Sequence, residues 1–288
     1  MHLLTFNPDR FFSRKYPFRK VHSAALIFSV LLLSVPTVQA QTSETSWEVG
    51  INDQWFHYEE KLANGTTLNT EEGWLPGFYM SANTSLPSDF ELAFVVSRAK
   101  GTANYEGTTQ AGHPLSTHTT ETITHAGAEL FTPVPNAFPE SLSGVIGLSY
   151  TRWNRKIQPT SQSGHLYEHY RWYELSGGLQ HCSAPSAIEG IEQLCITAKL
   201  TRTERGTVTV RLDDLGLGNP KLNLGGEWGG EASMKLKLAG PLTLRLYTKS
   251  WSHGASKPVV IQQTTQYVRI TEPASQSWLT GIEAGFRF

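Results

Sequence analysis

The sequence has 288 residues, with 24 Lys and Arg, 25 Asp and Glu, and a formal net charge of −1. This balance excludes the clustered excess of positive charge that nucleic-acid binding requires. The 25 glycines and 15 prolines, with few long apolar runs, favour an all-β chain of many short strands and turns. No residue pattern implies a cofactor or a metal: the two cysteines lack the CxxC spacing of a zinc site.

The first 40 residues have the three parts of a secretory signal peptide. Five basic residues come first, residues 24–35 form an apolar run, and small residues lead to Ala40. This run rises about 18 Å as a helix, too little to cross a hydrocarbon core of about 30 Å. We therefore expect cleavage near Ala40 and a mature domain of residues 41–288, with an uncleaved N-terminal anchor as the alternative. Removing the five basic residues and one acid leaves 19 basic and 24 acidic residues, a formal net charge of −5.

From Trp47 onward, segments with alternating apolar residues recur, as in strands with one apolar and one polar face. We count ten, whose apolar faces begin at Trp47, Trp74, Phe90, Thr124, Ile146, Tyr173, Leu194, Leu224, Leu242 and Ile282. Short turns are predicted near 87–89, 133–141, 183–192 and 239–241. Longer loops are predicted near 59–72, 101–118, 156–165, 205–221 and 253–275.

The two cysteines, Cys182 and Cys195, both lie in the exported part. An oxidising compartment permits a disulfide between them. A loop of this size would stabilise the fold by roughly 3 kcal/mol. We therefore predict Cys182 and Cys195 as a candidate disulfide.

The last segment, residues 280–288, places Ile282, Ala284, Phe286 and Phe288 on one face. Its abrupt end on an aromatic residue resembles the last strand of bacterial outer-membrane β-barrels, in which a terminal Phe is a sorting and assembly signal. The resemblance implies an antiparallel up-and-down transmembrane β-barrel in a Gram-negative outer membrane. It also implies a monomer in contact with lipid and lipopolysaccharide, and with the barrel-assembly machinery through Phe286 and Phe288.

The strand count is ten, with eight and twelve as the alternatives. An even number places both chain ends in the periplasm. Twelve strands would require residues 207–212 and 259–270 to cross the membrane as well. Gln and Thr on both faces of 262–266 leave no lipid-compatible side there, so we expect these segments to be hairpin extensions above the membrane.

Charges of both signs occupy the faces opposite the apolar ones. Side chains fill the narrow lumen of a ten-strand barrel, and charges buried there need partners. The turn at 239–241 sets a register that pairs Glu231 with Lys249 and Lys235 with Arg245, so Arg245 needs a nearby carboxylate such as Glu231 or Glu283. The alternative is a soluble sheet with solvated charges. The predicted lumen network comprises Glu227, Glu231, Lys235, Arg245, Lys249, Glu283 and Arg287.

A basic and aromatic group marks the outer ends of the fifth and sixth strands. The predicted register pairs tyrosine with tyrosine and arginine with arginine on the lipid side. Tyrosines with arginines beyond them are typical of an aromatic girdle that meets charged headgroups, and arginine can bind phosphate through two hydrogen bonds. The alternative is that these side chains only reach into water. The candidate contacts to lipopolysaccharide are Tyr150, Arg152, Arg155, Lys156, Arg171 and Tyr173.

The size and strand count are similar to those of the omptins, ten-strand outer-membrane proteases that need an Asp pair and a His-Asp pair across the barrel mouth. Neither pair can be placed: Asp213 and Asp214 would point to opposite faces of a strand, and His253 has no local Asp partner. Lipid-A-modifying barrels need a His-Ser arrangement, for which Ser163, His165 and His169 offer only the residue types. We therefore assign no catalytic residue and no metal site.

Three functional hypotheses remain from the sequence. The leading one is a non-enzymatic outer-membrane protein whose surface loops serve envelope structure, adhesion or contact with a host or cell-surface ligand. The second is a porin-like narrow channel for small solutes. The third is an outer-membrane hydrolase, either a protease or a lipid-A-modifying enzyme.

Overall fold

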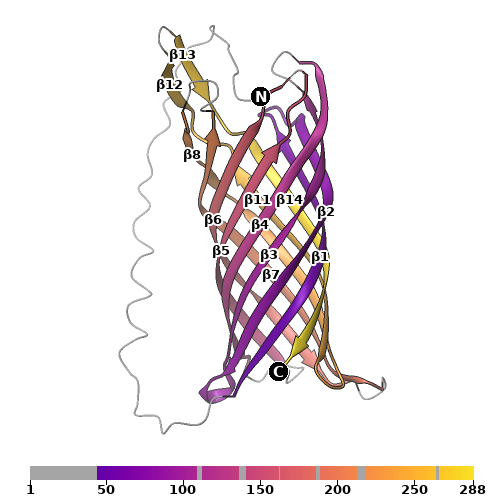
Figure 1. The fold of residues 1–288 in the computed structure, drawn as a ribbon. Helices are drawn as coiled ribbons and strands as arrows, with labels where there is room; N and C mark the ends of the chain where they lie inside the picture. Colours follow the sequence, from indigo (N-terminus) through magenta and orange to yellow (C-terminus); the bar gives the residue numbers. More distant parts are fainter. Residues whose placement is uncertain are drawn as a thin grey trace, which may run out of the picture.

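The computed structural model describes residues 44–108, 112–135, 141–161, 163–185, 189–212, 218–263 and 266–288. These residues form one closed antiparallel β-barrel (Figure 1). The predicted signal peptide and its cleavage near Ala40 lie outside the described residues and stay predictions. No helix in the described part of the chain is long and apolar enough to cross a membrane.

Ten long strands form the barrel wall, and the pairing of the first with the last closes it. This confirms the predicted ten-strand up-and-down barrel. The strands are β1 (Thr45–Lys61), β2 (Thr67–Ser85), β3 (Glu91–Thr108), β4 (Pro114–Pro133), β5 (Leu142–Ile157), β6 (Leu166–Ser183), β7 (Ile191–Arg211), β10 (Trp228–Leu238), β11 (Leu242–Gly254) and β14 (Ala274–Arg287).

Smaller elements occupy the two ends of the barrel. A 3-10 helix, η1 (Pro87–Asp89), lies in the turn between β2 and β3. At the opposite end, β8 (Lys221–Asn223) pairs with β7 and β9 (Gly225–Gly226) pairs with β11. There, β12 (Val259–Gln263) and β13 (Gln266–Ile270) form a separate two-stranded sheet. We call the end with η1 and the C-terminus the turn end, and the end with β12 and β13 the loop end (Figure 1).

Both registers predicted from the sequence are confirmed. A hairpin turn of fixed length sets which residues face each other, so the numbering alone gives the partners. The pairs are Glu231 with Lys249, Ser233 with Tyr247 and Lys235 with Arg245 across β10 and β11, and Leu148 with Leu175, Tyr150 with Tyr173 and Arg152 with Arg171 across β5 and β6.

Large apolar side chains surround the turn-end part of the barrel on its outside, as a lipid environment requires. We call this surface the apolar belt. Two aromatic pairs lie at its border toward the loop end: Trp55 with Trp74, and Tyr150 with Tyr173. The exposed members of the belt include Ile51, Phe78, Val96, Ile146, Leu175, Ile196, Leu200, Leu246, Ile282 and Phe286.

The strands continue well beyond the belt, which corrects the predicted loops. The sequence predicts a loop over 59–72, yet β1 runs to Lys61 and β2 begins at Thr67. The loops predicted over 101–118 and 156–165 are also partly strand, and the hairpin extensions expected at 207–212 and 259–270, within the last two predicted loops, are confirmed. Outside the lipid the outer face no longer needs apolar residues, so the signal used to find strands disappears while backbone pairing continues.

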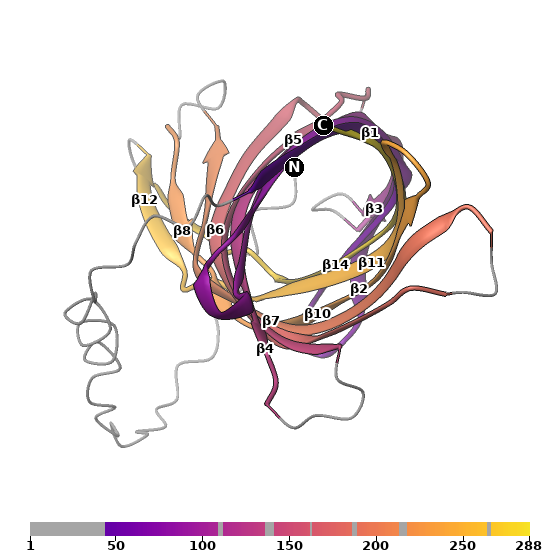
Figure 2. The ribbon, with the colours of Figure 1, turned by 90° about the horizontal axis from the view of Figure 1, so that it is seen from below.

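Within this loop-end extension the apolar residues face inward. Phe56, Trp153 and Val208 are each 0% exposed and belong to one hydrophobic core inside the barrel. The view along the barrel shows the ring of strands that encloses this space (Figure 2). The barrel is therefore apolar outside near its turn end and apolar inside near its loop end.

Candidate functional site

An ion-pair network lines the lumen at the level of the apolar belt. Arg245 binds the carboxylates of Glu231 at 2.6 Å and Glu283 at 3.1 Å. Lys235 faces Arg245 across the strands and binds Glu48 instead, at 2.8 Å. Opposite charges within hydrogen-bond distance compensate each other in a narrow lumen. The predicted need of Arg245 for a nearby carboxylate is thus met, by both of the candidates.

The network has members that the sequence prediction did not assign to it. Lys199 binds Glu129 at 2.5 Å and Glu231 at 3.0 Å, and Lys249 binds Glu174 at 2.7 Å. Glu129 and Glu174 come from β4 and β6, neither of which is paired with β10 or β11 in the barrel wall. The strand period places all of these side chains on the inner faces of their strands. Only the closure of the barrel brings them to the same level along the barrel axis, where they form ion pairs.

Two predicted members of the lumen network lie elsewhere. Glu227 is exposed, next to the short strand β9. Arg287 binds Glu192 at 3.0 Å at the turn end, where it also donates to the carbonyl oxygen of Gly240. Both residues lie at strand ends, where a side chain on the inner face of the strand no longer points into the lumen.

A cavity of about 290 Å³ lies beside the network. On the β2 and β3 side it is lined by small residues such as Ser81, Ser97 and Ala99, which leave room in front of the long ionic side chains. Asn83, Gln193 and Lys237, from strand ends at the turn end, also line it, and the side chains of Trp172 and Trp251 lie at its other end. The lumen is thus open space near the turn end.

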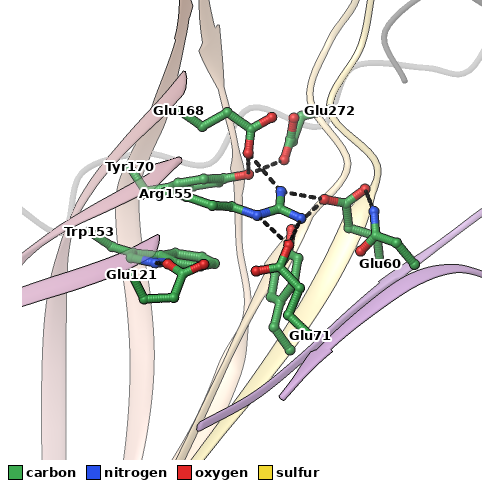
Figure 3. Close-up of polar contacts among 10 residues, drawn as sticks. Glu60, Glu71, Glu121, Trp153, Arg155, Glu168, Tyr170 and Glu272 are labelled. Atoms are coloured by element: carbon green, nitrogen blue, oxygen red, sulfur yellow. Dashed lines mark hydrogen bonds and ion pairs between the residues drawn. The ribbon is translucent and has the colours of Figure 1, made fainter. Parts of the chain in front are cut away.

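The loop end of the lumen is filled by a second charged group, built around Arg155 (Figure 3). The guanidinium donates through Nε to Glu71 at 2.7 Å, and through one terminal nitrogen to Glu60 at 2.9 Å and Glu168 at 2.6 Å. Its plane also lies 4.7 Å from the ring centre of Tyr58, a cation-π contact. Arg155 therefore holds together residues of β1, β2, β5 and β6.

Two further carboxyl groups complete this group, which we call the Arg155 cluster. Glu121 accepts a hydrogen bond from the indole nitrogen of Trp153 and lies against the carboxyl group of Glu71. Glu272, from the connection between β13 and β14, lies against Tyr170 (Figure 3). The cluster comprises Glu60, Glu71, Glu121, Arg155, Glu168 and Glu272, none of which is more than 4% exposed.

The Arg155 cluster has five carboxyl groups and one guanidinium, so it is strongly acidic. Together with the surrounding aromatic core it fills the lumen at the loop end. Within the described residues, no group of three or more His, Cys, Asp or Glu side chains is arranged to hold a metal ion. The buried cluster and the core thus occupy the barrel interior at this end.

The predicted lipopolysaccharide contacts divide between the two faces of the wall. Arg152 and Arg171 are exposed on the outside, and Tyr150 and Tyr173 lie next to them toward the belt. Arg155 instead points into the lumen and is only 2% exposed, so a lipid headgroup cannot reach it. The strand period contains this information, because Arg155 is three residues from Arg152 and therefore on the opposite face.

The outer surface beyond Tyr150 and Tyr173 carries further basic residues. Lys156 lies 5.1 Å from the ring centre of Tyr167, and Arg211 lies 5.5 Å from the same ring. These two residues flank Tyr167 on the neighbouring strands. We call Arg152, Lys156, Arg171 and Arg211 the basic patch.

The residues considered for catalysis do not assemble with each other in the described part of the chain. His253 is buried against Trp172, with ring centres 5.0 Å apart, and neither of its nitrogens has a hydrogen-bond partner among the described residues. Ser163 bonds to Thr160. Asp213 and Asp214 lie outside the described residues.

The predicted disulfide is present. Cys182 and Cys195 are bonded and face each other across β6 and β7 at the turn end. Both line the cavity.

Comparison with known proteins supports the fold alone. No family model and no curated protein sequence matches the chain. Among solved structures, the chain is similar to the outer membrane protease OmpT of Escherichia coli, with a TM-score of 0.53, 7% identity, and coverage of 85% of this chain and 96% of that one. The translocator domain of the autotransporter NalP of Neisseria meningitidis has a TM-score of 0.44 at 11% identity, covering 84% of this chain and 88% of that one. The toluene transporter TodX of Pseudomonas putida has a TM-score of 0.39 at 9% identity, covering 86% and 89%.

The chain thus has the ten-strand fold of outer-membrane β-barrels, as its last strand indicates. Identity of this order transfers no activity, so function must be argued from the chain's own residues.

Proposed function

We propose that this protein is an exported, monomeric outer-membrane β-barrel that does not conduct solutes and that presents its loop end at the cell surface as a binding platform. The observation that carries this proposal is the closed loop end. Among the described residues, buried aromatic side chains and the Arg155 cluster fill the lumen there, so the open space near the turn end does not continue through the loop end. A porin needs a continuous polar bore.

The orientation follows from the general architecture of such barrels. Short turns face the periplasm and longer connections face outward, which places the loop end outside the cell. The C-terminal residue continues the wall, because Phe288 and Trp47 exchange two backbone hydrogen bonds of 2.9 and 3.0 Å. This supports assembly through Phe286 and Phe288, whose side chains are 50% and 67% exposed.

The basic patch supports anchoring in lipopolysaccharide. Arg152 and Arg171 face each other just beyond the tyrosine pair, at the height where lipid headgroups begin. Two guanidinium groups side by side attract a phosphate anion that each can bind through two hydrogen bonds. Lys156 and Arg211 add positive charge on the same surface.

The hairpin of β12 and β13 supports the binding platform. Its outward face exposes Val260 and Tyr267, which are 60% and 68% exposed. Gln262 pairs with Tyr267, and Arg269 pairs with Val260. Exposed Tyr and Arg next to an apolar residue have the composition of protein-binding surfaces.

Planar-bilayer recording tests the closed lumen. We expect refolded mature protein at neutral pH to give no conductance steps, whereas a general porin refolded in parallel does. Regular steps from the purified protein would overturn the proposal and favour the porin-like channel.

Lipid A tests the basic patch. We expect bisphosphorylated lipid A to raise the unfolding temperature of the refolded wild-type protein more than dephosphorylated lipid A does, and R152Q/R171Q to lose this difference. The matched control is R98Q/K100Q, which removes the same charge from exposed positions on β3. An equal loss in both variants would show that net charge alone is responsible.

Attachment tests the platform. Cells that display the wild-type protein are expected to adhere to some members of a panel of immobilised host-matrix proteins and glycans, and cells with V260S/Y267S are expected to adhere less. Equal adhesion of both cell types would count against the hairpin.

A further inference from the structure

The hairpin of β12 and β13 is fastened to the barrel by two short segments, 255–258 and 271–273, which we call the strap. The backbone nitrogen of Ser256 donates to the carbonyl oxygen of Glu272 at 2.9 Å, and the backbone nitrogen of Glu272 donates to the hydroxyl of Ser256 at 2.8 Å. Next to the strap, Ile270 is 0% exposed and packs into the hydrophobic core. The strap thus holds the hairpin against the loop end of the barrel.

The side chain of Glu272 joins the strap to the Arg155 cluster through one hydroxyl group. The hydroxyl oxygen of Tyr170 lies 2.5 Å from a carboxyl oxygen of Glu272 and 3.1 Å from one of Glu168 (Figure 3). A hydroxyl has a single hydrogen, so it can donate to only one of the two. If both carboxyl groups were ionised, the other contact would bring two oxygen atoms together with no proton between them.

One proton on Glu272 satisfies both contacts. Glu272 then donates to the oxygen of Tyr170, and Tyr170 donates to Glu168. Glu168 is the group that stays ionised, because the guanidinium of Arg155 lies 2.6 Å from its oxygen. Glu272 has no ion pair with Arg155 among the contacts of the described residues, so its charge would be uncompensated.

The surrounding charges favour the same assignment. The five carboxyl groups and one guanidinium of the cluster would have a net charge of −4 if all were ionised. Burial, followed by repulsion from Glu168 and Glu60, raises the pKa of Glu272 well above its ordinary value. The titratable and charged groups on the packed elements are Tyr58 and Glu60 on β1, Glu71 on β2, Tyr105 on β3, Glu121 on β4, Arg155 on β5, and Glu168 and Tyr170 on β6.

We propose that Glu272 is a proton-dependent latch: its protonated carboxyl group fastens the strap to Tyr170, and loss of this proton at alkaline pH releases the strap and the hairpin from the barrel. The closed form binds the proton more tightly than the open form. Closure is therefore fully stable at low pH, and it weakens as the pH rises toward the raised pKa of Glu272 in the closed form. The latch goes beyond the proposed function, whose conductance test is made at neutral pH.

Thiol labelling of refolded full-length mature protein tests the latch. The reporter is I270C, which is buried while the strap is closed, and the control is V260C, which is exposed on the same hairpin and corrects for thiol ionisation. Between about pH 6 and about pH 9, we expect the labelling rate of I270C relative to V260C to rise, by up to about tenfold per pH unit while the pH lies between the carboxyl pKa of the open form and the raised pKa of the closed form, and to level off above the raised pKa. In the E272Q background, where the side chain stays neutral, the ratio is expected to remain flat.

Two results would overturn the latch: a flat ratio with Glu272 present, or an equal rise with E272Q. E106Q, at an exposed glutamate on β3, is the control for removal of a carboxylate and should behave as the wild type. If I270C does not give heat-modifiable folded protein, V268C, which is partly buried against the same core, replaces it with the same expected ratios.

Discussion

Replacement of Arg155 by Met is the most direct test of how the loop end is held closed. The side chain of Arg155 is 1% exposed, and the side chains of its partners Glu60, Glu71 and Glu168 are 6%, 0% and 4% exposed. R155M leaves these three buried carboxylates without the cation that they share. Methionine has similar length and no charge, so the change removes the ion pairs with little loss of volume.

The expected cost follows from the burial of the three partners. Removal of one member of a buried ion pair lowers the free energy of unfolding by about 3–5 kcal/mol, because the remaining charge is uncompensated. The cost should shrink as the pH falls, since the orphaned carboxylates of the variant then take up protons and become neutral. A surface pair behaves differently: Arg202 and Glu204 have side chains 43% and 42% exposed, so R202M should change the free energy of unfolding by about 1 kcal/mol or less.

Urea unfolding of refolded protein, followed by tryptophan fluorescence at pH 8 and pH 5, measures both quantities. The reasoning is refuted if R155M costs no more than R202M at pH 8, or if its cost is the same at both pH values. Neutralising the partners should restore stability to R155M, so R155M/E71Q is expected to be more stable than R155M alone.

Three further predictions use the same unfolding and folding assays. E121Q keeps an acceptor for its indole partner and removes a carboxyl group from an acidic cluster, so it should leave the free energy of unfolding unchanged or raise it by up to roughly 1 kcal/mol, whereas E168Q should lower it. A large loss in E121Q would show that the wild-type protein depends on an ionised Glu121. C182A/C195A should lose up to roughly 3 kcal/mol, and the wild type under reducing conditions should show the same loss; no change in either would mean that the paired strands already restrict the chain. Deletion of Phe288 should reduce the yield of heat-modifiable folded barrel in cells, because two backbone hydrogen bonds to the first strand are lost; an unchanged yield would contradict its role in assembly.

The part of the chain in contact with lipid was predictable because lipid imposes a rule on every strand. Each outward residue there must be apolar, so the alternation from Trp47 onward reveals the strands and their outer faces. Tight turns then give the registers, as in the pairing of Lys235 with Arg245.

Beyond the lipid this rule no longer applies, and the strand residues 59–61 fall in a predicted loop, whereas residues 207–212 and 259–270 were expected to be hairpin extensions, as the structure shows. The assignment of Arg155 to the outer surface fails for a different reason. It relied on closeness in sequence to Arg152, although the strand period already placed the two residues on opposite faces.

The sequence by itself determined the β-barrel class, its apolar outer surface and the local pairing of neighbouring strands, because each depends on contacts between residues close in the chain or on a uniform solvent. Only the tertiary structure decided that Glu60, Glu71, Glu121, Glu168 and Glu272 surround one arginine. These residues come from four strands and a connection, and the height at which they meet depends on how far successive strands are staggered around the closed barrel. That stagger brings residues as far apart as Glu60 and Glu272 into one buried group.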